Sequence, residues 1–87
     1  MANIASAIKR NRQNAKRRAH NRHYRSTMRT EIRKVRAAIE AGDKDAAQAL
    51  LPGTVAIIQR VAQKGIIHKR NAARRLSRLN KAILEID

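Results

Sequence analysis

The sequence predicts an all-α protein, an up-down-up bundle of three helices whose long basic N-terminal helix projects beyond the core. Three observations predict this class. The 87-residue chain is rich in Ala, Arg, Lys, Leu, Ile and Gln and has only three glycines and one proline, a composition typical of helices. Apolar residues recur at spacings of three and four. Turn signals divide the chain twice, at Gly42 and at Gly65.

The first helix is predicted over residues 6–41. Only its C-terminal half carries an apolar stripe at helical spacing, formed by Tyr24, Met28, Ile32, Val35 and Ile39. Residues 1–24 are therefore expected to be a basic arm that includes the first half of this helix and is mobile or partly unfolded without a partner. Residues 25–87 are expected to form the bundle of a single domain.

The second helix is predicted over residues 44–64. Asp43 stands where a helix cap is needed, and Asp45 lies favourably in the first turn. Pro52 interrupts the segment, since proline lacks a backbone donor. The inward stripe nevertheless keeps its phase across Pro52, so a kinked helix is predicted, with a true break as the alternative; the stripe consists of Ala47, Leu51, Thr54, Ile58 and Val61.

The third helix is predicted over residues 68–85 and is strongly amphipathic. Its inward stripe consists of Ala72, Leu76, Leu79, Ile83 and Ile86. Almost opposite lies a cationic face of Arg70, Arg74, Arg78 and Lys81. His68 is expected on the inward side at the start of this helix, in a structural or capping role.

The charge of the chain indicates a polyanionic partner. Lys and Arg number 21 against 6 Asp and Glu, a net charge of +15, which opposes compaction through self-repulsion. The segment KRNRQNAKRRAHNRHYR contains eight basic residues and no carboxylate, and before Arg18 these are Lys9, Arg10, Arg12, Lys16 and Arg17. The middle of the chain, residues 37–63, is nearly neutral.

Six arginines share one face of the first helix, and we call them the arginine ridge: Arg18, Arg22, Arg25, Arg29, Arg33 and Arg36. Like charges at four-residue spacing destabilise a helix, so the alignment calls for a partner. Phosphates supply one, because they accept paired bonds from guanidinium groups. The ridge and the cationic face of the third helix are interpreted as binding separate nucleic-acid helices, of folded RNA or of DNA, and holding them at a fixed distance.

Other functions receive less support. A nucleoid-type DNA-binding protein remains the main alternative, and binding to an anionic membrane surface ranks low because the core consumes the apolar faces. His20, His23, Thr27 and Glu31 are the best candidates for chemistry, yet no third metal ligand has a convincing spacing. No metal, cofactor or catalytic residue is predicted, the chain lacks cysteine, and no signal peptide or membrane span is found. A cytoplasmic protein is expected.

Three segments, MANIASAIKR, MRTEIRKVRAAIEAGDKDAAQ and QKGIIHKRNAARR, resemble the bacterial small-subunit ribosomal protein twenty family. The likeness covers essentially the whole chain and both turn positions. Two departures concern Ile8, where the family often has a basic residue, and Pro52-Gly53, within a helix that the family usually runs without a break.

The resemblance implies a three-helix bundle that is a structural constituent of the small ribosomal subunit, present as a monomer. It implies direct binding to small-subunit ribosomal RNA early in assembly, at the five-prime domain and the long helix of the three-prime minor domain. It implies that the N-terminal arm and first helix carry most of the RNA contacts. The family positions matched in this chain are Asn3, Ser6, Lys9, Arg10, Arg29, Thr30, His68, Lys69 and Arg74.

Overall fold

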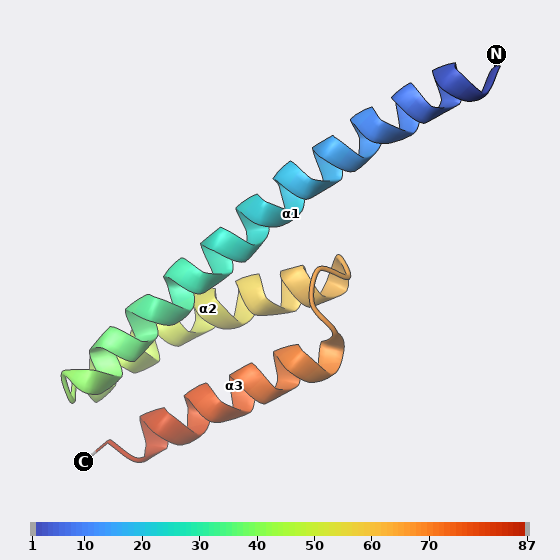
Figure 1. The fold of residues 1–87 in the computed structure, drawn as a ribbon. Coiled ribbons are helices and arrows are strands. Elements are labelled where there is room, and N and C mark those ends of the chain that lie inside the picture. The colour runs from blue at the N-terminus through green and yellow to red at the C-terminus, as the bar shows by residue number, and fades with distance from the viewer. Residues whose placement is uncertain (1, 87) are drawn as a thin grey trace.

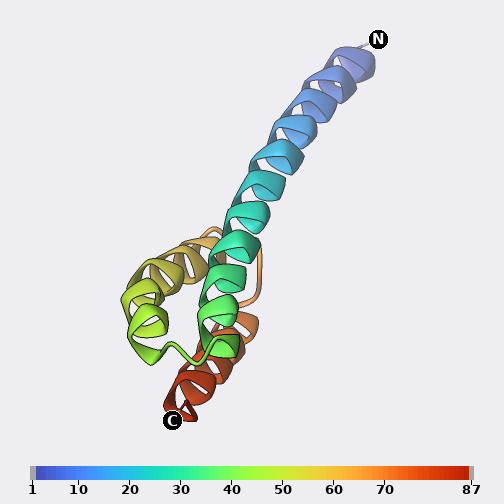
Figure 2. The same cartoon turned by 90° about the vertical axis from the view of Figure 1, so that its left-hand side faces the viewer.

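The computed structural model describes residues 2–86, with side chains from Ile4 onward. It contains three helices, α1 (Ala2–Glu40), α2 (Lys44–Gln63) and α3 (Lys69–Leu84). They run up, down and up, and α2 and α3 lie beside the C-terminal half of α1 (Figure 1). The view turned by 90° shows the N-terminal half of α1 extending alone (Figure 2). The predicted class and the projecting first helix are confirmed.

The projecting helix makes the molecule elongated. A compact domain of this length has a radius of gyration of about 12 Å, whereas that of this protein is 17.6 Å. The longest dimension is 67 Å, and an α-helix of 39 residues accounts for about 58 Å of it at 1.5 Å per residue. The N-terminal half of α1 is therefore a rod beyond the bundle.

The helix boundaries lie close to the predicted ones, with one difference of four residues. α1 begins at Ala2 and not at residue 6. The residues before Ser6 include Ala and Ile and no proline or glycine, so nothing in them prevents the helix from starting earlier.

Both interhelical turns have the same construction. Gly42 and Gly65 adopt positive φ angles of 71° and 76°, the left-handed conformation that glycine favours. The N–H of the following residue then reaches back into the preceding helix, from Asp43 to the Ala38 carbonyl and from Ile66 to the Val61 carbonyl. The predicted Asp43 cap is confirmed, because its Oδ1 accepts a hydrogen bond of 3.1 Å from the Ala46 N–H.

α2 passes through Pro52 without leaving the helical conformation, so the alternative of a true break is wrong. The inward phase survives as predicted, since Ala47, Thr54 and Ile58 are all buried. Thr54 is the only buried polar residue among those described. Its hydroxyl donates to the Leu50 carbonyl at 3.2 Å, which removes the cost of burying it unpaired.

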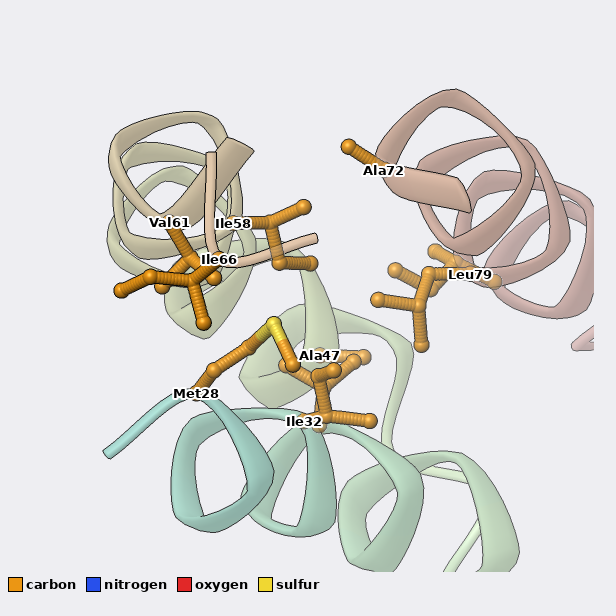
Figure 3. Close-up of a cluster of buried hydrophobic side chains, with 10 residues drawn as sticks. Met28, Ile32, Ala47, Ile58, Val61, Ile66, Ala72 and Leu79 are labelled. Atoms are coloured by element: carbon orange, nitrogen blue, oxygen red, sulfur yellow. The ribbon is translucent and has the colours of Figure 1, made fainter. Parts of the chain in front are cut away.

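The core lies where the three predicted stripes meet. In Figure 3, Met28 and Ile32 of α1 face labelled side chains of α2 and α3, and Val35 belongs to the same buried cluster. α1 packs most extensively against α2 and least against α3. The remaining members of the buried cluster are Ala47, Ile58, Val61, Ile66, Ala72, Leu79 and Ile83.

α3 begins after His68, which is its N-cap. The His68 Nδ1 accepts a hydrogen bond of 3.1 Å from the Arg70 N–H, which confirms the capping role. Its placement on the inward side was wrong, because the residue is exposed. The cap requires an extended backbone at position 68. His68 therefore does not follow the helical periodicity of α3, from which its inward position was predicted.

One arginine of the ridge bonds to the turn between α2 and α3. The Arg25 Nη2 donates to the Ile66 carbonyl at 3.4 Å, 41 residues away in sequence. Arg25 therefore supports the fold in addition to presenting positive charge, a role that helical periodicity does not indicate.

The two glycines Gly65 and Gly53 offer a test of the backbone argument. Gly65→Ala is expected to destabilise the fold by about 1 kcal/mol, because an L-residue resists the left-handed conformation. Gly53→Ala, inside α2, is expected to stabilise it by about 0.5 to 1 kcal/mol. An added Cβ meets no atom within 4 Å at either site, so the backbone alone distinguishes them. Urea unfolding followed by circular dichroism measures both, and effects of the same sign would contradict the account.

The Arg25 contact predicts an asymmetry within the arginine ridge. Arg25→Ala is expected to lower the free energy of unfolding by about 0.5 to 1 kcal/mol, since a tertiary hydrogen bond is lost. Arg22→Ala is the matched control on the same helix, and it is expected to leave stability unchanged or slightly raised because a like-charge neighbour is removed. Urea unfolding at low salt tests both, and equal losses would show that the Ile66 contact contributes nothing.

Candidate nucleic-acid interface

The arginine ridge forms one exposed face of α1. All six of its arginines are exposed, because they lie beside the core stripe on positions that the helix turns toward solvent. With Asn21, Ser26 and Thr30, five of them line a long open hollow along α1. The ridge spans about 27 Å at 1.5 Å per residue, and the hollow presents donors along its length.

The arginine ridge and the cationic face of α3 approach each other where α1 lies beside α3, and we call the hollow between them the α1–α3 groove. The two surfaces were interpreted as binding separate nucleic-acid helices, but the arginines at their facing edges line the same hollows. Ile32 and Leu79 form its apolar floor, and both belong to the buried core. The walls consist of arginines from the two helices, Arg29, Arg33 and Arg36 of α1 and Arg74, Arg75 and Arg78 of α3.

Shared arginines make the ridge and the groove one continuous surface. Arg29 and Arg33 line both the long hollow of α1 and the groove. Arg36 continues the groove toward a further hollow near the end of α1, which Glu40 also lines. The arginines of the ridge therefore continue into the walls of the groove.

The N-terminal arm carries basic residues on two opposite sides. At 100° per residue, five of them share an arc of about 160°, and Arg18 and Arg22 of the ridge lie opposite that arc; the five are Lys9, Arg10, Arg12, Lys16 and Arg17. All of them are exposed. Unlike the ridge, the arm can neutralise anionic surfaces on more than one side at once.

The outer face of α2 differs from both basic surfaces. Its exposed residues are mostly uncharged or small and include Gln48, Ala49, Pro52, Gly53, Ala56, Gln59 and Gln63. Arg60 and Asp45 are the charged residues of this face. Most of the basic surface therefore lies on α1 and α3, and so do the predicted contact residues other than His68, which caps α3.

The remaining predicted contact residues fall into three groups. Ser6 is exposed on the arm, and Lys69, Arg70 and Lys81 are exposed on α3. The Thr30 hydroxyl donates its proton to the Ser26 carbonyl at 2.9 Å. In this rotamer the hydroxyl has no proton left to donate to a phosphate, and its oxygen can only accept a hydrogen bond. The Asn3 side chain lies outside the described residues.

His20, His23, Thr27 and Glu31 do not form a reactive cluster. The two histidine rings pack edge-on against Tyr24, with centroids at 4.7 and 5.7 Å, and Lys64 Nζ lies 4.8 Å from the Tyr24 centroid. The Thr27 hydroxyl donates to the His23 carbonyl. Glu31 pairs with Lys34 at 3.3 Å. Within the described part of the chain, no three potential ligands are arranged to hold a metal ion.

Sequence reasoning missed Arg75 and Asn71. The Arg75 Nε donates to the Asn71 Oδ1 at 2.7 Å, and both residues are half-buried. Arg75 was overlooked because it lies on the flank of α3, between the inward stripe and the cationic face. Its four-residue spacing from Asn71 was the one available signal.

None of the helices in the described residues combines the length and the apolar character that crossing a membrane requires.

Comparison with known proteins identifies relatives along nearly the whole chain. The small ribosomal subunit protein bS20 of Trichlorobacter lovleyi is 52% identical over 83 residues, which cover 95% of each chain. The protein of the same name from Teredinibacter turnerae is 57% identical over 83 residues, or 95% of this chain and 94% of the relative. That of Thiobacillus denitrificans is 55% identical, with 95% of each chain covered.

The sequence model of the family described as ribosomal protein S20 matches residues 2–84. That range includes α1, α2 and α3 in full. With the fold, the basic surfaces and these relatives taken together, the chain belongs to the ribosomal protein S20 family, whose members are structural constituents of the small ribosomal subunit and not enzymes.

Proposed function

We propose that this protein binds small-subunit ribosomal RNA directly through α1 and α3 and holds RNA segments together during assembly of the subunit. The observation that carries the proposal is the continuous arginine surface, which runs from the ridge into the α1–α3 groove. The net charge of +15 requires a polyanion, and the small subunit supplies one in its RNA.

The mode of recognition is contact with the backbone and with RNA shape. Tyr24 is the only aromatic residue of the Phe, Trp and Tyr class, and it is half-buried between two histidines and Lys64. A platform for stacking successive unpaired bases is therefore absent from the described residues. Arginine forks pair with phosphates in a defined geometry, so specificity comes from how the RNA places its phosphates along the protein.

The arm and the bundle have different parts in this proposal. Residues 1–24 act as a basic rod inserted between RNA segments, because positive charge lies on opposite sides of the rod. Residues 25–87 form the bundle, which presents the groove and the rest of the ridge, from Arg25 to Arg36, at one end of the rod. In keeping with the family resemblance, the RNA partners are the five-prime domain and the long helix of the three-prime minor domain, and the protein acts as a monomer.

The salt dependence of binding tests the proposal. For about eight neutralised phosphates, log K is expected to fall with log salt at a slope of about −6 to −7. Filter binding is measured with full-length bacterial small-subunit ribosomal RNA, a non-ribosomal RNA of equal length and duplex DNA. A preference for the ribosomal RNA that persists at high salt is expected. Equal binding to all three, lost together as salt rises, would leave only non-specific attraction, and a preference for DNA would favour a nucleoid protein.

Hydrogen exchange tests the division into arm and bundle. In the free protein, amides of residues 4–20 are expected to exchange much faster than those of residues 28–39. The arm makes no core contact, its like charges oppose helix formation, and isolated helices are marginal in water. Binding of the ribosomal RNA is expected to slow exchange in the arm. An arm already as protected as residues 28–39 in the free protein would contradict this prediction.

A further inference from the structure

We propose that the α1–α3 groove holds one stretch of RNA sugar-phosphate backbone, and that Asn71 positions Arg75 for this contact. The inference rests on the proposed function and assigns to it a site and a positioning residue. The ridge and the cationic face of α3 then act on the same RNA strand where they meet.

The shape of the groove suits a phosphodiester. The part bounded by Arg36 and α3 has a volume of about 190 Å³, which far exceeds the space that one water molecule needs. Ile32 and Leu79 close its floor and are 7% and 3% exposed. Charge-assisted hydrogen bonds above such an apolar floor are less weakened by solvent than those on an open helix face.

The charges of the groove suit an anion. Six arginines line it, and no carboxylate does. Glu40 lines only the adjoining hollow, together with Arg36 and Arg78. Lys34–Glu31 is the one ion pair in the described part of the chain, and neither partner lines the groove. Repulsion between the two walls is therefore unrelieved until an anion enters.

Arg75 differs from the other groove arginines in being held in place. Its Nε donates to the Asn71 Oδ1 at 2.7 Å, and it has no other hydrogen bond to the described residues. The bond leaves both terminal nitrogens of the guanidinium free, and these nitrogens pair with phosphate oxygens. Because the side chain is half-buried and already oriented, it loses less freedom on binding than an exposed arginine does.

The matched control for Arg75 is Arg60. Both residues are arginines inside helices, so each substitution by Ala removes one positive charge. Arg60 is exposed on the neutral outer face of α2 and lines neither the groove nor the ridge. Asn80, exposed on α3, is the corresponding control for Asn71.

The experiment measures binding of these variants to full-length bacterial small-subunit ribosomal RNA across a range of salt. Arg75→Ala is expected to weaken binding about 10- to 100-fold, as for the loss of hydrogen bonds to a charged group, and to reduce the salt slope by about 0.7 to 0.9. Arg60→Ala is expected to weaken it by less than about 3-fold and to leave the slope unchanged. Asn71→Ala is expected to weaken binding several-fold with the slope retained, and Asn80→Ala is expected to have no effect.

Arg75→Lys distinguishes the loss of an RNA contact from a loss of folding. It keeps the charge and the aliphatic stem but lacks the planar fork, so we expect about a 10-fold weaker complex with helicity and melting temperature unchanged. Wild-type affinity for this variant would overturn the positioned contact.

The outcomes separate the two proposals. If wild-type protein prefers the ribosomal RNA while Arg75→Ala behaves like Arg60→Ala, the groove proposal is wrong and the proposed function stands. If the wild-type protein binds all RNAs alike, the proposed function is wrong, and the groove is not a ribosomal RNA site.

Discussion

The apolar seam between α1 and α2 is the contact on which the rest of the structure depends. α1 carries twelve Lys and Arg against two Glu, and α3 carries six with no acidic residue, so these helices repel each other. α2 has two basic residues and one acidic residue. α2 packs more extensively against α1 than against α3, and α1 and α3 contact each other least. Burial of Val35 of α1, Ile58 of α2 and Leu79 of α3, which are 0%, 0% and 3% exposed, holds the like-charged helices together through the nearly neutral α2.

This arrangement explains why the basic surfaces are so concentrated. The buried face of each helix is apolar, and the outer face of α2 carries little charge. The positive charge is consequently left on the arm, the ridge and the sides of the α1–α3 groove. A small domain with a thin core has limited free energy of unfolding, so any polyanion that binds only the folded protein would stabilise the bundle.

Membership in the ribosomal protein S20 family agrees with the recognition of RNA backbone that we propose. The described residues contain no group of three potential ligands for a metal ion, and His20 and His23 pack against Tyr24. What the molecule does present is a helix of 39 residues with arginines aligned along one side, and a groove where that side meets α3. These features suit a protein whose role is to hold folded RNA in a defined arrangement.

Helical periodicity determined most of the fold. The three stripes, the Gly42 and Gly65 turns, the Asp43 cap and the survival of helical phase across Pro52 all depend on local spacing and backbone preference, which the order of residues specifies directly. The sequence also determined the arginine ridge, since residues three and four apart share a helix face whatever packs against it.

Only the tertiary structure decided how those faces meet. The α1–α3 groove, the Arg25 bond to the Ile66 carbonyl and the approach of Lys64 to Tyr24 all join residues far apart in sequence. Their geometry depends on how α1 and α3 are set against α2, and no single-helix pattern encodes that. Arg75 shows most clearly what a single-helix pattern cannot predict, because this residue on the flank of α3 lines a groove only when the flank of α1 lies opposite it.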